Sequence, residues 1–303
     1  MERGLVPVEV PSGRADALGK PHWLAYRTWA VFDPGSRVWT FPLLPRRVRK
    51  SGDAKAYAWQ QAPVRVRVTP TVASSAASQL FLTGGLEPPD GAENPGSSMR
   101  VSATTESFDA IGLSWRESRP MKTPRYLHGA AFDAKGRLFV FGGSGAEPSV
   151  TQEDGESAES FRHRVEANAA KANTSLASVE MYDPATNTWT ERAPLPTPRQ
   201  AMGADLGADG RIYVVGGAPS YAHPRPMAVV EIYDPESDIW ETGPSMHYAR
   251  RGHAVVATPE GKLYAIGGVV GRRQRTLREQ LAGDFVDPAL GATVEMLDTR
   301  PGR

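Results

Sequence analysis

The chain has 303 residues, of which 35 are Lys or Arg and 34 are Asp or Glu, so its formal net charge at pH 7 is +1. This balance gives no global attraction to nucleic acid or to anionic membranes, and neither is expected as a partner. Cysteine is absent, which excludes a disulfide framework, a thiolate metal site and a Cys nucleophile.

The first 27 residues are expected to form an irregular N-terminal segment. Residues 1–25 lack the apolar run of a signal peptide, and no stretch of the chain approaches the ~18 apolar residues of a membrane span. We therefore expect a soluble protein. A chain without Cys is stable in either redox environment, so its compartment stays unknown, with the cytoplasm favoured.

One phrase recurs four times after residue 28 and identifies a repeat architecture. It contains an Asp, a Trp six residues later, and an apolar run that ends in Gly-Gly. The Asp–Trp pairs are Asp33/Trp39, Asp109/Trp115, Asp183/Trp189 and Asp234/Trp240. The Gly-Gly pairs are Gly84/Gly85, Gly142/Gly143, Gly216/Gly217 and Gly267/Gly268. A fifth phrase starts at residues 294–298 and would place its Trp at position 304.

The unit at residues 177–217 shows how one phrase folds. Residues 177–183 alternate apolar and polar side chains, which is the period of a half-buried strand, and residues 184–187 have turn chemistry. Residues 188–192 form the returning strand, and three prolines within 194–198 then require a loop. A small-residue strand (201–206), a tight turn (208–210) and an apolar strand (211–215) complete the unit. Each unit therefore predicts four short antiparallel strands.

Four short strands per roughly 50 residues, with one Gly-Gly and one Trp each, resemble the kelch motif of β-propellers. Kelch repeats also carry a Met or Leu followed four residues later by Arg, which appears here as Met121/Arg125, Leu195/Arg199 and Met246/Arg250. The resemblance implies an all-β kelch-type propeller over residues 28–303, with about four to five blades of four antiparallel strands. The strands are labelled a to d from the axis outward and follow the order c, d, a, b in each repeat. The repeats lie near 28–85, 104–143, 177–217 and 229–268, with a partial one at 292–298.

The number of c strands exceeds the number of complete blades, and this leaves two possibilities for the ring. The d strand at residues 38–41 could complete the last blade and close a ring of four. Alternatively, the chain is an incomplete arc, which we favour because kelch rings of four blades are unusual. An open arc would expose a sheet face and invite self-association.

The predicted binding face is the one that carries the long loops. Antiparallel succession places the b–c and d–a connections on one face and the a–b and c–d turns on the other. The readable turns are all short, whereas the inserted loops at 46–64, 144–178 and 269–292 belong to the first class. Long loops gathered on one face usually carry binding.

Eight residues in the d–a loops are candidates for ligand or partner contact. They are Arg125, Tyr126, His128, Arg199, Tyr248, Arg250, Arg251 and His253. Arg and His at a channel mouth suit carboxylate or sulfate groups of a peptide or an acidic sugar. The alternative, which their repetition favours, is that the three arginines hydrogen-bond loop carbonyls between blades. The motif Trp residues are expected to pack between blades.

Two insertions carry weaker signals. Glu159 and His163 have a helical metal-ligand spacing inside a stretch rich in helix formers, but no third ligand accompanies them, so a solvated helical loop is favoured and no metal is expected. Residues 271–281 contain four Arg, which suits either an anionic ligand or an exposed basic loop.

Two function classes remain open. The first is a non-catalytic interaction module that binds a protein or peptide on the long-loop face, and we favour it. The second is a carbohydrate-binding or carbohydrate-modifying propeller of the epimerase or mutarotase kind, which needs only a few acid–base groups. Copper chemistry of the galactose-oxidase kind needs a Cys cross-linked to a Tyr and is excluded, and a sialidase signature is absent. No catalytic residue and no cofactor are assigned.

Overall fold

A computed structural model describes residues 71–74, 79–87, 99–109, 114–147, 155–220, 222–271 and 294–300, together with six short strands between residues 11 and 58. The chain separates into two units, Met1–Pro63 and Val64–Arg303. The boundary divides the first predicted repeat, because its c and d strands fall in the first unit and its a and b strands in the second.

The first unit contains three antiparallel strand pairs. β1 (Pro11–Ala15) pairs with β2 (Pro21–Trp23), β3 (Val31–Asp33) with β4 (Val38–Thr40), and β5 (Arg46–Arg47) with β6 (Tyr57–Ala58). The segment 1–27, expected to be irregular, thus includes a strand pair, and so does the predicted loop 46–64. β3 and β4 are a c–d pair in which Phe32 lies opposite Trp39.

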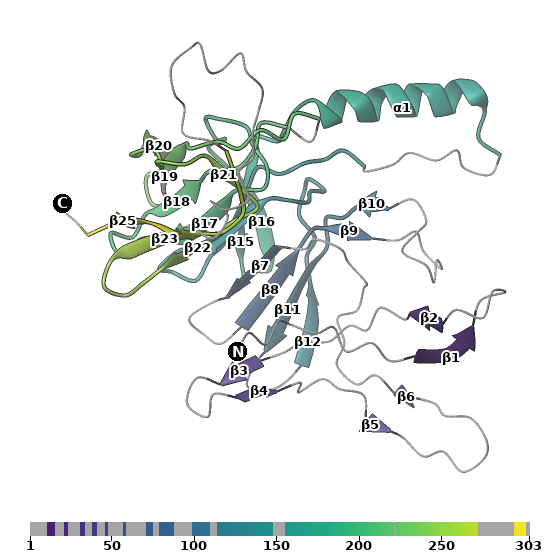
Figure 1. Cartoon of the computed structure of the whole chain (residues 1–303), viewed down its shortest axis with the longest axis horizontal. Helices are drawn as coiled ribbons and strands as arrows, with labels where there is room; N and C mark the ends of the chain where they lie inside the picture. The colour runs from purple at the N-terminus through teal and green to yellow at the C-terminus, as the bar shows by residue number, and fades with distance from the viewer. Residues whose placement is uncertain are drawn as a thin grey trace. The chain divides into compact units, whose positions relative to one another are not determined.

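The second unit contains four antiparallel blades, and the prediction of a kelch-type β-propeller fold is confirmed (Figure 1). Blade 1 contains β7 (Thr71–Ser74), β8 (Gln79–Thr83), β11 (Thr105–Asp109) and β12 (Ser114–Ser118). Blade 2 contains β13 (Gly129–Phe132), β14 (Leu138–Phe141), β15 (Val179–Asp183) and β16 (Thr188–Arg192). Blade 3 contains β17 (Gly203–Leu206), β18 (Ile212–Val215), β19 (Val230–Asp234) and β20 (Ile239–Thr242). Blade 4 has three described strands, β22 (Ala254–Ala257), β23 (Lys262–Ile266) and β25 (Val294–Asp298).

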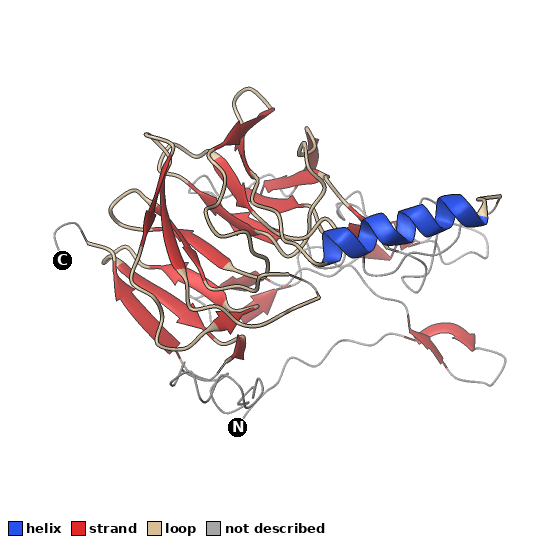
Figure 2. Cartoon of the chain, turned by 90° about the horizontal axis from the view of Figure 1, so that it is seen from above, coloured by secondary structure: helices blue, strands red, loops and turns tan. Residues whose placement is uncertain are grey.

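Three smaller elements lie in the connections between these strands. β9 (Leu86–Glu87) pairs with β10 (Arg100–Val101), and β21 (Arg250–Arg251) pairs with β24 (Val269–Val270). The helix α1 (Ala158–Ala172) lies in the b–c connection of blade 2 and projects away from the strands of the blades (Figure 2).

The blades pack face to face because each strand alternates its side chains between two neighbours. Phe81 of blade 1 packs with Leu138 of blade 2 in one core cluster, and Phe141 of blade 2 packs with Tyr233 of blade 3 in the next. A third cluster joins blades 3 and 4. Each innermost strand packs on the next one, in the order β7, β13, β17 and β22. The first and last of these strands, β7 and β22, do not pack on each other in this way.

The motif Trp residues do not all pack between blades as we expected. Trp189 and Trp240 do, because each belongs to a core cluster shared with the preceding blade. Trp115 differs: it is partly exposed, it lies outside the core clusters of the described residues, and its ring packs on Phe108 of its own blade at 5.0 Å.

The far face of blade 4 exposes apolar side chains. Val294 and Met296 are each 53% exposed, although the equivalent residues of blade 2, Val179 and Met181, are buried against blade 3. Among the described residues, no strand packs on this face of blade 4.

The first three Gly-Gly pairs are required by the close approach of the next blade. The second Gly of each donates its amide to the carbonyl of the motif Arg in the following loop, as Gly143 does to Arg199 at 2.9 Å. The first Gly has a positive φ, +55° at Gly142, and an added Cβ there would lie 2.4 Å from the same carbonyl oxygen. Only glycine satisfies both constraints.

The fourth pair departs from the repeat role that we predicted for all four. Gly268 is exposed, and no described loop of a following blade supplies a carbonyl to its amide. It keeps a positive φ of +82°, and an added Cβ would lie 2.6 Å from the Arg251 carbonyl in its own blade. Gly267 and Gly268 therefore contact the d–a loop of blade 4, and no described residue makes with them the junction that the other pairs make with the next blade.

We predict that Gly142→Ala destabilises the protein far more than Gly210→Ala. Both positions have a positive φ, which costs an L-residue about 1–2 kcal/mol, but an added Cβ at Gly210 meets nothing within 4 Å. The clash at Gly142 should raise the loss to about 3 kcal/mol or more. Urea unfolding measures both variants, and equal losses would contradict the close-approach explanation.

Candidate functional site

The d–a and b–c connections emerge from the same ends of the strands. Neighbouring strands are antiparallel throughout the four blades, so these connections form one face, called here the loop face. The described d–a loops are 119–128, 193–202 and 243–253. The opposite face, called here the turn face, carries short turns such as 133–137 and 184–187.

The three motif arginines are fully buried and have internal partners. Arg125 donates to the Glu180 carboxylate at 2.6 Å and to the carbonyls of Gly142 and Ser178 at 2.9 Å. Burial lowers the pKa of the Arg125 guanidinium, while Glu180 opposes the shift, so the group stays charged. This buried ion pair connects the d–a loop to the c strand of the same blade.

The same arrangement recurs in the next two blades. Arg199 pairs with Glu231 and also donates to the Val214 carbonyl. Arg250 pairs with Glu295 at 3.2 Å. All three guanidiniums have no exposed surface, so they stabilise the loop face from inside and do not present charge at its rim.

The partner glutamates are residues that sequence reasoning missed. Glu180 also accepts backbone N–H groups from Lys122 and Thr123, and in blade 3, where Pro196 stands at the position of Lys122, Glu231 accepts the Thr197 hydroxyl instead. A signal was present in the sequence, because these glutamates occupy the same position of each c strand, three residues before its Asp.

We predict that Glu180→Gln lowers the free energy of unfolding by about 3–5 kcal/mol, because it leaves the buried Arg125 charge uncompensated. The matched control is Glu236→Gln, since Glu236 pairs with Lys135 and Arg137 at the exposed surface, where such pairs contribute about 0–1 kcal/mol. Guanidinium unfolding compares the two variants. A similar, small loss in both would contradict the role of the buried pair.

His128 and His253 are buried beside the Gly-Gly pairs and are not on the rim. His128 Nε2 lies 2.8 Å from the Thr83 hydroxyl, and Thr83 directly precedes a Gly-Gly pair. At the equivalent positions blade 3 has Met202 with Phe141, an apolar pair within one core cluster. In blade 4 the equivalent pair has one polar and one apolar member, because His253 lies beside Val215. Neither ring nitrogen of His253 has a hydrogen-bond partner among the described residues.

Both histidines are held neutral. Burial, assisted by Arg125, lowers the pKa of His128 well below its ordinary value. Burial, assisted by Arg250 and opposed by Glu295, lowers the pKa of His253 to about 4. Both pKa values lie below that of an unfolded histidine, so folding is opposed by protonation of these side chains. The free energy of unfolding is therefore unaffected by these groups above pH 6.5 and decreases as the pH falls below that value.

We predict that His253→Met stabilises the protein at pH 7 by about 1–3 kcal/mol, because it removes two unsatisfied buried nitrogens and installs the residue that blade 3 uses. The variant should also lose less stability between pH 6.5 and pH 4, by up to about 1.4 kcal/mol per pH unit. Denaturant unfolding across this pH range measures both effects.

The control for this prediction is His128→Met. It should reduce the acid sensitivity in the same way but lower stability at pH 7 by about 1 kcal/mol, because Thr83 loses its partner. If both variants destabilise the protein equally at pH 7, the different environments of the two histidines do not matter.

The remaining candidates differ in accessibility. Tyr126 is buried and forms an isolated bridge with Ser144. Tyr248 and Arg251 are partly exposed, with the Tyr248 amide donating to Glu295 and Arg251 lying in β21. These two are the candidates that remain available at the surface. The basic residues 272–281 lie outside the described part of the chain.

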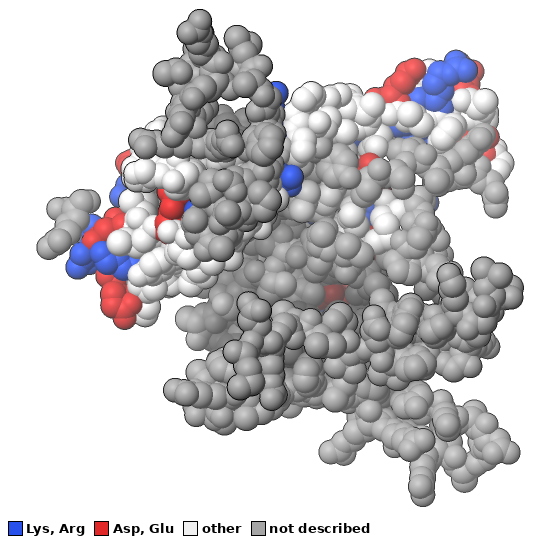
Figure 3. Space-filling view, in the orientation of Figure 1, with Lys and Arg blue, Asp and Glu red and all other residues white. Residues whose placement is uncertain are grey.

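The helix α1 is the largest described feature of the loop face. Ser157 caps its N-terminus, none of its residues is buried, and acidic and basic side chains lie side by side on its surface (Figure 3). Asn168 exchanges two hydrogen bonds with the backbone of Glu147, and the Ala172 carbonyl accepts the amide of Ala222 in the b–c loop of blade 3. The helix is thus attached to two blades while its outer surface stays exposed.

The described residues show no cluster of three or more His, Cys, Asp or Glu side chains that could hold a metal ion. Glu159 and His163 both lie on α1 and are exposed. None of the described helices is long and apolar enough to span a membrane.

Four-stranded antiparallel blades, Gly-Gly junctions and Trp-bearing outer strands define a β-propeller built from repeats. The kelch motif matches residues 168–196 and 207–247 of the chain, which cover parts of blades 2 and 3. The chain thus contains kelch repeats and is similar to kelch-repeat proteins.

Curated relatives agree with this assignment. The chain is 29% identical over 203 residues to kelch repeat and BTB domain-containing protein 12 of Danio rerio, covering 64% of the chain and 29% of that protein. It is 26% identical over 217 residues to beta-scruin of Limulus polyphemus, covering 70% of the chain and 20% of that protein. With Kelch-like protein 25 of Xenopus tropicalis it shares 30% identity over 162 residues, covering 54% and 22%. The chain thus spans less than a third of the length of these relatives.

Proposed function

We propose that the protein is a non-catalytic interaction module that binds a protein or peptide partner on the loop face. The observation that carries the proposal is α1, a helix attached to the blades through Asn168 and Ala172 with no buried residue of its own. Ordering fifteen residues costs conformational entropy that burial does not repay here, so a contact with a partner is a physical reason for such an element.

The rim of the loop face has the composition of a contact surface. Its exposed residues include Lys122, Pro124, Pro196 and Pro198, with Tyr248 partly exposed beside them. Rigid prolines lose little entropy on binding, and tyrosine supplies a large amphipathic contact area. This rim and the surface of α1 together form the surface that we assign to a partner.

The charged residues around the loops favour binding over carbohydrate chemistry. A sugar-modifying site needs a carboxylate free to accept or give a proton near the reacting atoms. Glu180, Glu231 and Glu295 are instead held by buried arginines and by donors of the loops. No observation on the described residues favours the carbohydrate alternative.

We predict that a photo-crosslinking residue placed at Arg162 of α1 or at Lys122 captures a partner polypeptide, whereas one at Lys135 does not. Lys122 lies in a d–a loop and Lys135 in a turn of the turn face. Their side chains are comparably exposed, at 51% and 60%, so the comparison isolates the face. Mass spectrometry of crosslinked products from cell extract identifies what is captured.

The triple variant Arg162→Ala, Val165→Ala and Glu166→Ala provides the control for folding. These side chains are exposed and alanine favours the helix, so the melting temperature should stay within about 2 °C while capture from Lys122 falls. Capture from Lys135 alone would overturn the assignment of the loop face.

A further inference from the structure

The d–a loop 193–202 places its side chains alternately inside and outside the protein. Leu195 and Arg199 are buried, and Thr197 between them donates its hydroxyl to Glu231 at 2.6 Å. The side chains that alternate with these, at positions 194, 196 and 198, are exposed. The d–a loop before β13 has the same alternation, with inward side chains at 121, 123 and 125 and outward ones at 120, 122 and 124.

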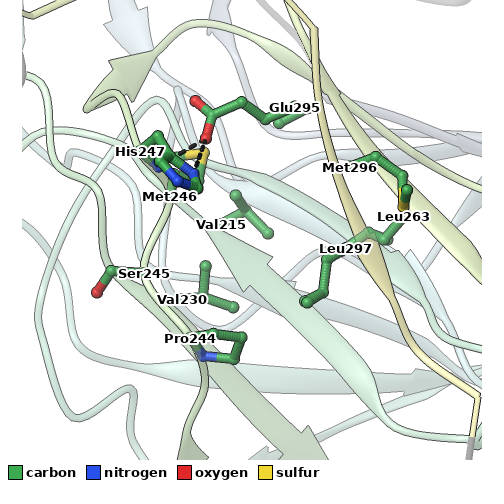
Figure 4. A pocket seen from close by; sticks show the side chains of 11 residues that line it. Val215, Val230, Pro244, Ser245, Met246, His247, Leu263, Glu295, Met296 and Leu297 are labelled. Carbon is green, nitrogen blue, oxygen red and sulfur yellow. Dashed lines mark hydrogen bonds and ion pairs between the residues drawn. The ribbon is translucent and has the colours of Figure 1, made fainter. Parts of the chain in front are cut away.

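Five of these six outward positions hold exposed prolines, called here the proline ridge, and the sixth holds Lys122. The prolines are Pro120, Pro124, Pro194, Pro196 and Pro198. The third described d–a loop has Ser245, His247 and Ala249 at the equivalent positions (Figure 4 shows Ser245 and His247). The fold therefore accepts other residues at each of the three positions, and the prolines of blades 2 and 3 are not required by it.

The backbone of the proline ridge offers hydrogen-bond acceptors and few donors. Proline itself has no N–H. In residues 119–125 every amide N–H is used inside the protein, those of Lys122 and Thr123 by the Glu180 carboxylate. The carbonyls of the five prolines, in contrast, accept from no described residue. A partner that contacts the ridge therefore meets proline rings and carbonyl oxygens.

Proline rings next to carbonyls suit aromatic side chains that carry a hydrogen-bond donor. The ring packs on the pyrrolidine, and the N–H of Trp or the O–H of Tyr donates to the carbonyl, as in grooves that bind proline-rich segments. Both loops already make the second contact internally. Trp240 donates its indole N–H to the Ala193 carbonyl at 3.0 Å, and Trp189 donates to the Arg119 carbonyl at 2.7 Å. In both cases the acceptor directly precedes a proline of the ridge.

The proline ridge belongs to the same two blades as α1 and adds no net charge to them. The helix lies in the b–c connection of blade 2, and the carbonyl of its last residue binds the Ala222 amide of blade 3. Lys122, which interrupts the prolines, pairs with Glu191 at 3.3 Å. Because this charge is already paired, an ionic partner surface gains little here, and neutral aromatic contacts are favoured.

We propose that the proline ridge recognises a partner surface that carries exposed Trp or Tyr side chains, which stack on the proline rings and donate hydrogen bonds to their carbonyls. The ridge is rigid before binding, so this contact costs little conformational entropy. The inference rests on the proposed function, which supplies a protein partner on the loop face, and it adds the chemistry by which that partner is recognised.

The first test uses the 303-residue chain with isotope-labelled proline, and N-acetyltryptophanamide as the probe. An indole stacked on a proline moves the ring protons upfield through its ring current, which NMR detects. We expect saturable upfield shifts at the five ridge prolines and none at Pro184 or Pro259, which are exposed in turns of the turn face. N-acetylleucinamide, which lacks a ring, should not displace the probe. Equal shifts at Pro184 and Pro259, or none at the ridge, would overturn the proposal.

The second test replaces two prolines by residues that other blades use at the same positions. The double variant Pro196→Lys and Pro198→Ala should keep the fold, with a melting temperature lowered by about 4 °C at most. It should reduce the probe-induced shift at Pro194, and the capture of a partner by a photo-crosslinker at Arg162 of α1, by about fivefold or more. His247→Ala, at the equivalent position of blade 4, is the matched control and should change neither.

The two tests distinguish a failure of the ridge from a failure of the loop face. Probe binding needs no partner, so its absence contradicts the role of the ridge while capture at Arg162 still reports on the loop face. Capture that the double variant leaves unchanged also contradicts the ridge and leaves the proposed function standing. If neither Arg162 nor Lys122 captures a polypeptide, the proposed function is wrong, and recognition by the ridge is wrong with it.

Discussion

Each of the three d–a loops that the structure describes contains a buried arginine on which the arrangement of neighbouring blades depends. Its side chain pairs with the c-strand glutamate of its own blade, and its carbonyl accepts the second Gly amide of the preceding blade, as Arg125 does from Gly85 and Arg250 from Gly217. One residue therefore connects the loop, the sheet of its own blade and the sheet of the preceding blade. An arginine suits this position because its five donors satisfy a carboxylate and several carbonyls at once.

This constraint explains why the loop face has a dry interior and a variable exterior. The charge that supports the face is neutralised beneath it, so the residues above it can change without exposing an unpaired ion. Lys122 and His247, which occupy equivalent positions, differ in side chain, but both donate a backbone amide to the glutamate below. Backbone groups thus perform the structural role and leave the side chains of these residues available for contact.

The repeat made the blades predictable, because strand alternation, turn residues and Gly-Gly pairs each reflect a local conformational requirement that is visible in the sequence. The position of the arginines was predictable for the same reason. Their burial was not, since it depends on Glu180 and its counterparts, which lie more than thirty residues further along the chain. The different surroundings of Gly268 were also missed, because the identity of a repeated residue does not show whether a described loop of another blade packs on it.

Equivalent positions in different blades also separate structural residues from residues with another role. Met202 with Phe141 and His128 with Thr83 are each matched pairs, so His253 beside Val215 is a departure that costs stability without serving the fold. The outer Trp shows the converse. In blades 2 and 3 an indole fills the site between sheets and binds a carbonyl, so its recognition chemistry is already established within the protein. Blade 4 keeps the walls of that site in its c strand and its d–a loop, so the repeat specifies the packing surface separately from the Trp that fills it.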